Sequence, residues 1–215
     1  MILLHNPEAT QQALDILRSG DYFDLSVIFM LVVVLYIYFN EYHKKNYNTI
    51  VAGLTLYMIH WFVEIINGVV QSVLGHALWT VPAGTSYLIL IGLGIELNLM
   101  FSIAGIAQSK LLPNDPKEPM FKVGRFSVPK PLAIGIGNAL VASIIEIFLI
   151  FTRSFVWIWW WWNAITVFIF VYIPFFVVSA YSYYWKPKTQ RNVILLLVLV
   201  NVVLVIIFGF ILGWI

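Results

Sequence analysis

Six long apolar runs, separated by short polar segments, dominate the pattern of this chain. They cover roughly residues 25–40, 49–74, 84–109, 131–152, 155–184 and 193–215. A helix needs about 20 apolar residues to cross the hydrocarbon core of a bilayer, and most of the runs reach that length. The pattern therefore predicts an all-α polytopic membrane bundle, with six transmembrane helices forming one domain over residues 25–215.

Residues 1–24 precede the first run and form a separate N-terminal segment. Asn6, Pro7 and Glu8 are typical of an N-cap, a first-turn proline and an acidic first turn, and Gly20 is a stop signal. We predict a short interfacial helix on the membrane surface, with a plain soluble leader helix as an equal alternative. The segment lacks the basic start and apolar core of a signal peptide.

Composition supports an integral membrane protein. The chain is 61% hydrophobic and 10% charged, with a mean hydropathy of +0.91, whereas soluble domains are roughly 45–50% apolar and about 25% charged. Cysteine is absent, which excludes disulfides and thiolate metal sites. The net charge of +2 is too small to indicate nucleic acid as a partner.

Lysine and arginine are distributed unevenly among the loops. Three alternate loops hold ten of the 12 basic residues, namely Lys44, Lys45, Lys110, Lys117, Lys122, Arg125, Lys130, Lys186, Lys188 and Arg191. The other side of the bundle has Arg18 and Arg153. Because cytoplasmic loops carry an excess of Lys and Arg, we expect these three loops in the cytoplasm and both termini outside. The membrane would be a prokaryotic cytoplasmic membrane or an ER-type membrane.

The second apolar run contains a row of polar residues, His60, Glu64, Asn67 and Gln71. Their spacing of four, three and four places them on one face of a helix. An ionisable group in hydrocarbon costs at least about 2.5–3.5 kcal/mol on insertion scales, so such groups usually mark a functional site. The alternative is that His60 and Glu64 form a satisfied hydrogen bond with no further role.

Other apolar runs carry polar groups at a similar depth. With about 1.5 Å of rise per residue, Glu64, Glu96, Glu146 and Asn163 would lie roughly 10–18 Å below the outer helix ends. We therefore expect a shared cavity with four candidate catalytic groups for proton transfer, His60, Glu64, Glu96 and Glu146. We expect a substrate-lining set of Asn67, Asn138, Asn163, Trp160 and Trp161, for which structural packing and interface anchoring are the alternatives.

Cofactors are not predicted, although a single divalent metal is one alternative for the same site. Its ligands would be the imidazole and the three carboxylates of the candidate catalytic set. Four consecutive tryptophans, residues 159–162, must point all round a helix, so at least one of them should face the bundle.

The polar pattern resembles a known membrane family. His60-x-x-x-Glu64, Glu96, Glu146 and Asn163-Ala164 resemble the emopamil-binding, or EXPERA, family over about residues 57–174. That family includes sterol Δ8–Δ7 isomerases and sigma-2-like lipid-binding proteins. The resemblance implies a five-helix cavity for a flat lipid, with His60 and Glu64 on the acid side and with Glu96 and Asn163 steadying a carbocation.

Two positions depart from the isomerases of that family. They have a tryptophan three residues after the asparagine, where this chain has Thr166, and a hydroxyl three residues after the acid of the third helix, where it has Leu99. These two departures count against catalysis as such.

Three functions fit the sequence. The first is a membrane enzyme or binding protein for an apolar lipid, such as a sterol or isoprenoid, with isomerase- or hydratase-type acid–base chemistry. The second is a proton-coupled transporter or carrier. The third is a structural subunit of a larger membrane complex. The expected partners are a membrane lipid or apolar small molecule and a second copy of the chain or another membrane subunit.

Overall fold

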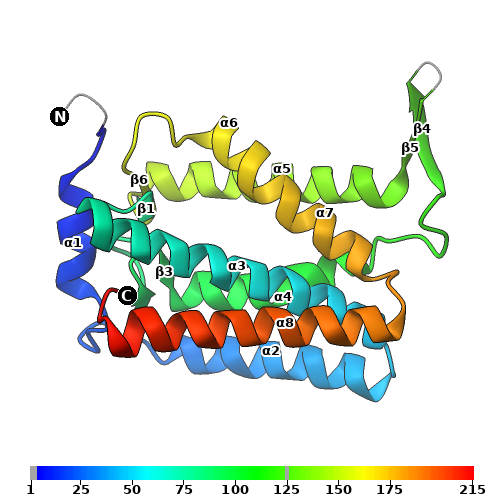
Figure 1. Cartoon of the computed structure of the whole chain (residues 1–215), viewed down its shortest axis with the longest axis horizontal. Coiled ribbons are helices and arrows are strands. Elements are labelled where there is room, and N and C mark those ends of the chain that lie inside the picture. The colour runs from blue at the N-terminus through cyan, green and yellow to red at the C-terminus, as the bar shows by residue number, and fades with distance from the viewer. Residues whose placement is uncertain (1–3, 124–125) are drawn as a thin grey trace.

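A computed structural model describes residues 4–123 and 126–215 as a predominantly helical protein (Figure 1). The helices are, in chain order, α1 (Glu8–Ile16), α2 (Ser26–His43), α3 (Tyr47–Leu74), α4 (Ile95–Ser109), α5 (Lys130–Phe151), α6 (Ala164–Val167), the π-helical turn η1 (Phe168–Tyr172), α7 (Ile173–Ser182), α8 (Pro187–Leu204) and the π-helical η2 (Val205–Ile211). The strands are β1 (Trp79–Thr80), β2 (Leu88–Leu90), β3 (Leu93–Gly94), β4 (Pro119–Val123), β5 (Phe126–Pro129) and β6 (Val156–Trp157).

The long helices run lengthwise through the bundle (Figure 1). In the described part of the chain, five helical stretches are long and apolar enough to cross a membrane: Ser26–His43, Tyr47–Leu74, Lys130–Phe151, Ala164–Ser182 and Pro187–Ile211. These spans make the chain an integral, multi-pass membrane protein. They correspond to five of the six predicted helices.

The third predicted helix is shorter than its apolar run. It was expected over residues 84–109, but α4 begins at Ile95 and has 15 residues, which gives a length of about 22 Å. The hydrocarbon core is about 30 Å thick. Residues 88–94 form the antiparallel β2–β3 pair instead, and the Ile95 N–H donates to the carbonyl of Tyr87.

The fifth predicted helix also begins later, at Ala164 rather than residue 155. The preceding segment contains β6, which pairs antiparallel with β1 in the register Trp79↔Trp157 and Thr80↔Val156. Aromatic and β-branched residues favour extended structure when a partner strand is present. The pairing satisfies backbone groups that would otherwise be exposed at this end of the bundle.

Helix α1 lies across one end of the bundle, next to β1 (Figure 1). Ala9 and Ala13 are buried, and Ala13 packs into the same apolar cluster as Trp79. The predicted N-terminal helix is therefore present, and it forms a cover over the β1–β6 pair.

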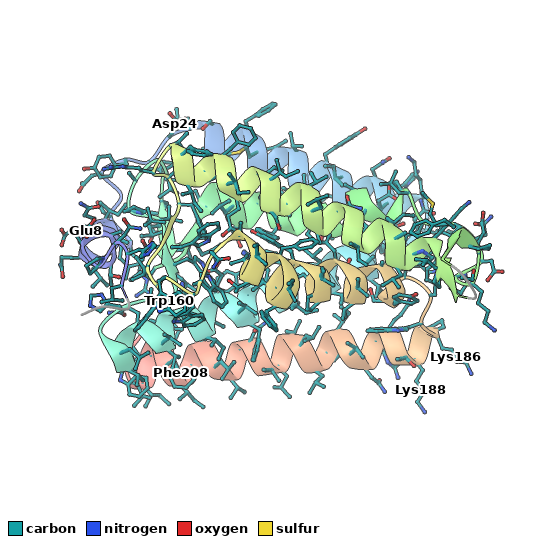
Figure 2. The ribbon with its side chains drawn as sticks, turned by 90° about the horizontal axis from the view of Figure 1, so that it is seen from above. Glu8, Asp24, Trp160, Lys186, Lys188 and Phe208 are labelled. Carbon is teal, nitrogen blue, oxygen red and sulfur yellow. The ribbon has the colours of Figure 1, made fainter. Side chains whose placement is uncertain are left out.

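The opposite end of the bundle carries the basic loops and the β4–β5 hairpin (Figure 1). In Figure 2, Lys186 and Lys188 lie at one end of the molecule, whereas Glu8 and Asp24 lie at the other. The long loop between α4 and α5 contains the hairpin and no helix in its described residues, which fits its four prolines.

Helix α3 is the central helix and packs against α4, α7 and α8. Gly105 of α4 lies so close to α3 that an added Cβ would be 2.5 Å from the carbonyl oxygen of Ala52. The Ser179 hydroxyl of α7 donates to the same carbonyl at 2.9 Å. These close contacts fix the rotation of α3, so that its polar face is turned into the bundle.

Candidate functional site: a cavity between α3, α4, α5 and α7

A cavity of about 220 Å³ lies between α3, α4, α5 and the α6–η1–α7 helix. Most of its lining is aliphatic or aromatic. The polar groups on its wall are His60, Glu64, Trp79, Asn138, Glu146, Trp162 and Tyr172. Three of the four predicted catalytic residues, His60, Glu64 and Glu146, therefore share one chamber.

His60 and Glu64 form the predicted pair on α3. The His60 Nε2 atom lies 3.4 Å from Glu64 Oε1, and both side chains are buried. The imidazole stacks on the ring of Phe101 from α4, with 3.9 Å between ring centroids and an interplanar angle of 12°. This stacking fixes the plane of the imidazole, so that its Nε2 edge faces the carboxyl group.

Two tryptophans, one from each strand of the β1–β6 pair, donate hydrogen bonds to the two carboxyl groups. The Trp79 indole donates to Glu64 Oε1 at 3.3 Å, and the Trp157 indole donates to Glu146 Oε1 at 2.6 Å. Trp79 and Trp157 are direct partners in the β1–β6 pair, and side chains paired in this way lie on the same face of the strands. One strand pair therefore positions carboxyl groups from α3 and α5 in the same region of the cavity.

Tyr172 is a further polar residue on the cavity wall, on the same side as Glu146. Its hydroxyl lies next to the Glu146 carboxyl. The residue belongs to η1, the π-helical turn that directly precedes α7, whose second residue is Pro174. Such wide turns are frequent at functional sites, and this one brings Val171 and Tyr172 onto the cavity wall.

Three polar atoms at the cavity are buried and have no hydrogen-bond partner among the described residues. They are His60 Nδ1, Glu64 Oε2 and Trp162 Nε1. A buried polar atom without a partner costs about 1–3 kcal/mol, and such atoms are rare in native proteins. All three atoms belong to residues that line the same chamber.

Glu96 does not line the cavity. It lies in the first turn of α4, where its carboxylate accepts hydrogen bonds from the Thr85 hydroxyl at 2.5 Å and the Ser86 N–H at 2.8 Å. The expected depth assumed a helix starting near residue 84, whereas α4 starts at Ile95. Glu96 therefore ties the preceding loop to the helix.

Asn67 and Asn163 also bond backbone rather than lining the cavity. Asn67 is fully buried and binds the backbone of Leu78 and Trp79. Asn163 caps α6 in a capping box that Thr166 completes. Asn138 does line the cavity, and its amide donates to the carbonyl of Ile134 in its own helix.

The tryptophan run divides between surface and cavity. Trp160 is 53% exposed and Trp161 is 38% exposed, and neither lines the cavity; Trp160 is labelled at the end of the bundle that also carries Glu8 (Figure 2). Trp162 is the member that faces inward, as expected of one of the four. Its ring stacks on Trp79 with 5.5 Å between centroids.

A metal is not supported by the donor set. Over residues 4–123 and 126–215, no group of three or more His, Asp or Glu side chains is placed to hold a metal ion. Glu96, the fourth member of the predicted ligand set, lies outside the cavity.

Sequence reasoning missed Trp79, Trp157, Trp162 and Tyr172 as site residues. Trp79 and Trp157 stand near the ends of apolar runs, where tryptophan is also common as an anchor at the membrane–water interface. The sequence does hold one signal for these strands. Aromatic and β-branched residues, which favour extended structure, are concentrated in Trp79-Thr80-Val81 and in Phe155-Val156-Trp157.

Comparisons with known proteins identify relatives without assigning an activity. No solved structure matches the chain significantly. A protein of Archaeoglobus fulgidus, described as an uncharacterized protein, is 39% identical over 213 residues, covering 97% of this chain and 99% of the relative. Residues 7–210 match an uncharacterized membrane protein family. The chain therefore belongs to this uncharacterized membrane protein family.

Proposed function

We propose that this protein binds an apolar lipid in the cavity and acts on it by proton transfer. The observation that carries the proposal is the acid–base pair His60–Glu64 at the wall of a chamber whose lining is mostly aliphatic or aromatic. An apolar wall excludes water, and a positioned carboxyl or imidazole group contributes typically 10²–10⁴-fold to a proton-transfer step.

The roles follow from the two sides of the chamber. His60 and Glu64, on α3, place Nε2 and Oε1 3.4 Å apart on one wall. Glu146, on α5, is held separately by Trp157 and lies beside Tyr172. A lipid between the helices would meet one group able to give a proton and another able to take one.

The resemblance to the EXPERA family supports this proposal through His60 and Glu64. It does not do so through Glu96 and Asn163, which lie outside the cavity and bond local backbone. Thr166, at one of the two departing positions, completes the α6 capping box. The cavity within a single chain favours a ligand-binding role over that of a purely structural subunit.

Membrane orientation is part of the proposal. We infer that α4 crosses with the five longer spans, so that both termini face outside and the basic loops face the cytoplasm. The ten-to-two distribution of Lys and Arg supports this arrangement. Because the chain has no cysteine, a single cysteine placed at Lys117 or Arg18 should react with an impermeant maleimide from opposite sides.

The direct test replaces Glu64 and, as a matched control, Glu96. Glu64→Gln keeps the size of the side chain and should lower the lipid retained by purified protein about tenfold, because it weakens a hydrogen-bonded polar group of the cavity. Glu96→Gln should leave retention unchanged. Native mass spectrometry of protein released from nanodiscs gives the occupancy, and circular dichroism checks folding. Equal lipid retention in folded Glu64→Gln and wild-type protein would remove the proposal.

A flux assay separates the proposal from a carrier. Protein reconstituted in liposomes should not move protons or solutes across the bilayer if the cavity only binds and converts a lipid. Protein-dependent flux that Glu64→Gln abolishes would favour the transporter instead.

A further inference from the structure

The cavity has an open side between α4 and α5. Met100 of α4 is 38% exposed, and Val141 and Ile145 of α5 are 54% and 41% exposed, yet all three line the cavity. Helix α4 packs mainly on α3 and helix α5 mainly on α7, and the two make few contacts with each other. Helix α5 is one of the five candidate spans, and with α4 crossing beside it as proposed above, the opening faces hydrocarbon.

The cavity is too small to enclose a whole lipid. Pockets that bury drug-sized ligands measure roughly 300–1,000 Å³, whereas this one measures about 220 Å³. A ligand that is a membrane lipid must therefore leave part of its body outside, and the opening between α4 and α5 leads directly to the acyl chains of the bilayer. The part outside must pass between two helices, and a single extended chain needs a narrower gap for this than a fused-ring system does.

The unpartnered atoms define the polar end of the ligand. Trp162 Nε1 is a donor only, whereas Glu64 Oε2 and His60 Nδ1 are able to accept. A hydroxyl group accepts a hydrogen bond from the Trp162 indole and donates its one proton to either Glu64 Oε2 or His60 Nδ1. A carboxylate or phosphate has no proton to give and would place negative charge beside Glu64 and Glu146, and no Lys or Arg is among the residues that line the described cavity.

We infer that the ligand is a single-chain lipid alcohol, bound by its hydroxyl at His60, Glu64 and Trp162, with its chain leaving sideways between α4 and α5. The inference rests on the proposed lipid-binding function and narrows its ligand. Entry follows the same path, so the lipid reaches the site from the bilayer without crossing an aqueous face.

Photolabelling of the full chain in lipid nanodiscs tests the inference. The reagents are diazirine derivatives of hexadecanol, of palmitic acid and of cholesterol, with labelled peptides identified by mass spectrometry. The hexadecanol derivative should label α4 and α5 peptides around Met100 and Ile145. The two other reagents should label these peptides about tenfold less, because each lacks either the hydroxyl head or the narrow chain.

Two variants of α5 test the exit path. Val141→Trp places a bulky ring at the opening, whereas Ile144→Trp places the same ring on an exposed position outside the cavity. We expect Val141→Trp to reduce hexadecanol labelling about tenfold and Ile144→Trp to leave it unchanged. Circular dichroism and monodisperse elution confirm that both variants fold.

The outcomes separate this inference from the proposed function. Specific labelling of the cavity by the cholesterol or palmitate derivative, equal to or above that by the alcohol, overturns the inference and leaves lipid binding standing. Equal labelling in Val141→Trp and Ile144→Trp overturns the lateral path. Absence of cavity labelling by all three reagents, together with absence of retained lipid in native mass spectra, overturns both.

Discussion

Replacement of Asn67 by alanine tests how strand β1 is held beside the cavity. The Asn67 side chain is fully buried, accepts a hydrogen bond from the Leu78 N–H at 2.8 Å and donates one to the Trp79 carbonyl at 2.9 Å. Each backbone group left without its partner costs about 1–3 kcal/mol, so the two together give roughly 2–6 kcal/mol. For a chain of this size each kcal/mol lowers the melting temperature by about 2–4 °C.

Asn67→Ala should therefore melt at least roughly 4 °C below the wild type. Asn138→Ala is the matched control, because its amide bonds only the Ile134 carbonyl of its own helix, and its free energy of unfolding should change by less than about 0.5 kcal/mol. Both variants would be melted in the same detergent and followed by circular dichroism. Equal melting temperatures for the two variants would refute the role given to Asn67 in holding β1.

Three further changes test other parts of the structure. Gly105→Ala should destabilise the α3–α4 contact by about 1–3 kcal/mol, because the new Cβ would meet the Ala52 carbonyl, whereas Gly137→Ala, with open space around it, should be neutral or stabilising in chemical denaturation. Trp157→Phe removes the donor to Glu146 and should weaken lipid retention more than Trp160→Phe does, as measured by native mass spectrometry. Burial raises the pKa of Tyr184 to about 12. The stability that comes from its hydrogen bond to the Pro113 carbonyl should therefore be full at neutral pH and be lost as the pH rises through about 12. An ultraviolet titration measures this pKa, with Tyr184→Phe identifying the signal, and an ordinary tyrosine midpoint at this residue would contradict the prediction.

The spans and the His60–Glu64 pair could be predicted from the sequence because both depend on local periodicity. Apolar length sets the spans, and the spacing of four sets the pair. Glu146 lies on the cavity wall at about the expected depth, since α5 is helical over almost the whole of its predicted run.

Strands β1 and β6 could not be predicted in the same way. An apolar run in a membrane protein predicts a helix, whereas Trp79 and Trp157 pair with each other across a long separation in the sequence. Glu96 and Asn163 were assigned a depth from runs whose first residues are not helical. Their true positions depend on where each helix begins, and those starts are set by tertiary hydrogen bonds.

The most direct test of a lipid site at His60 and Glu64 is a cryo-electron microscopy map of the protein in nanodiscs made from its native membrane lipids. We predict elongated density that begins between Glu64, Trp162 and Glu146 and leaves the bundle between α4 and α5. A cavity filled by side chains alone, with the Glu64 and Glu146 carboxyl groups turned away from each other, would contradict the account.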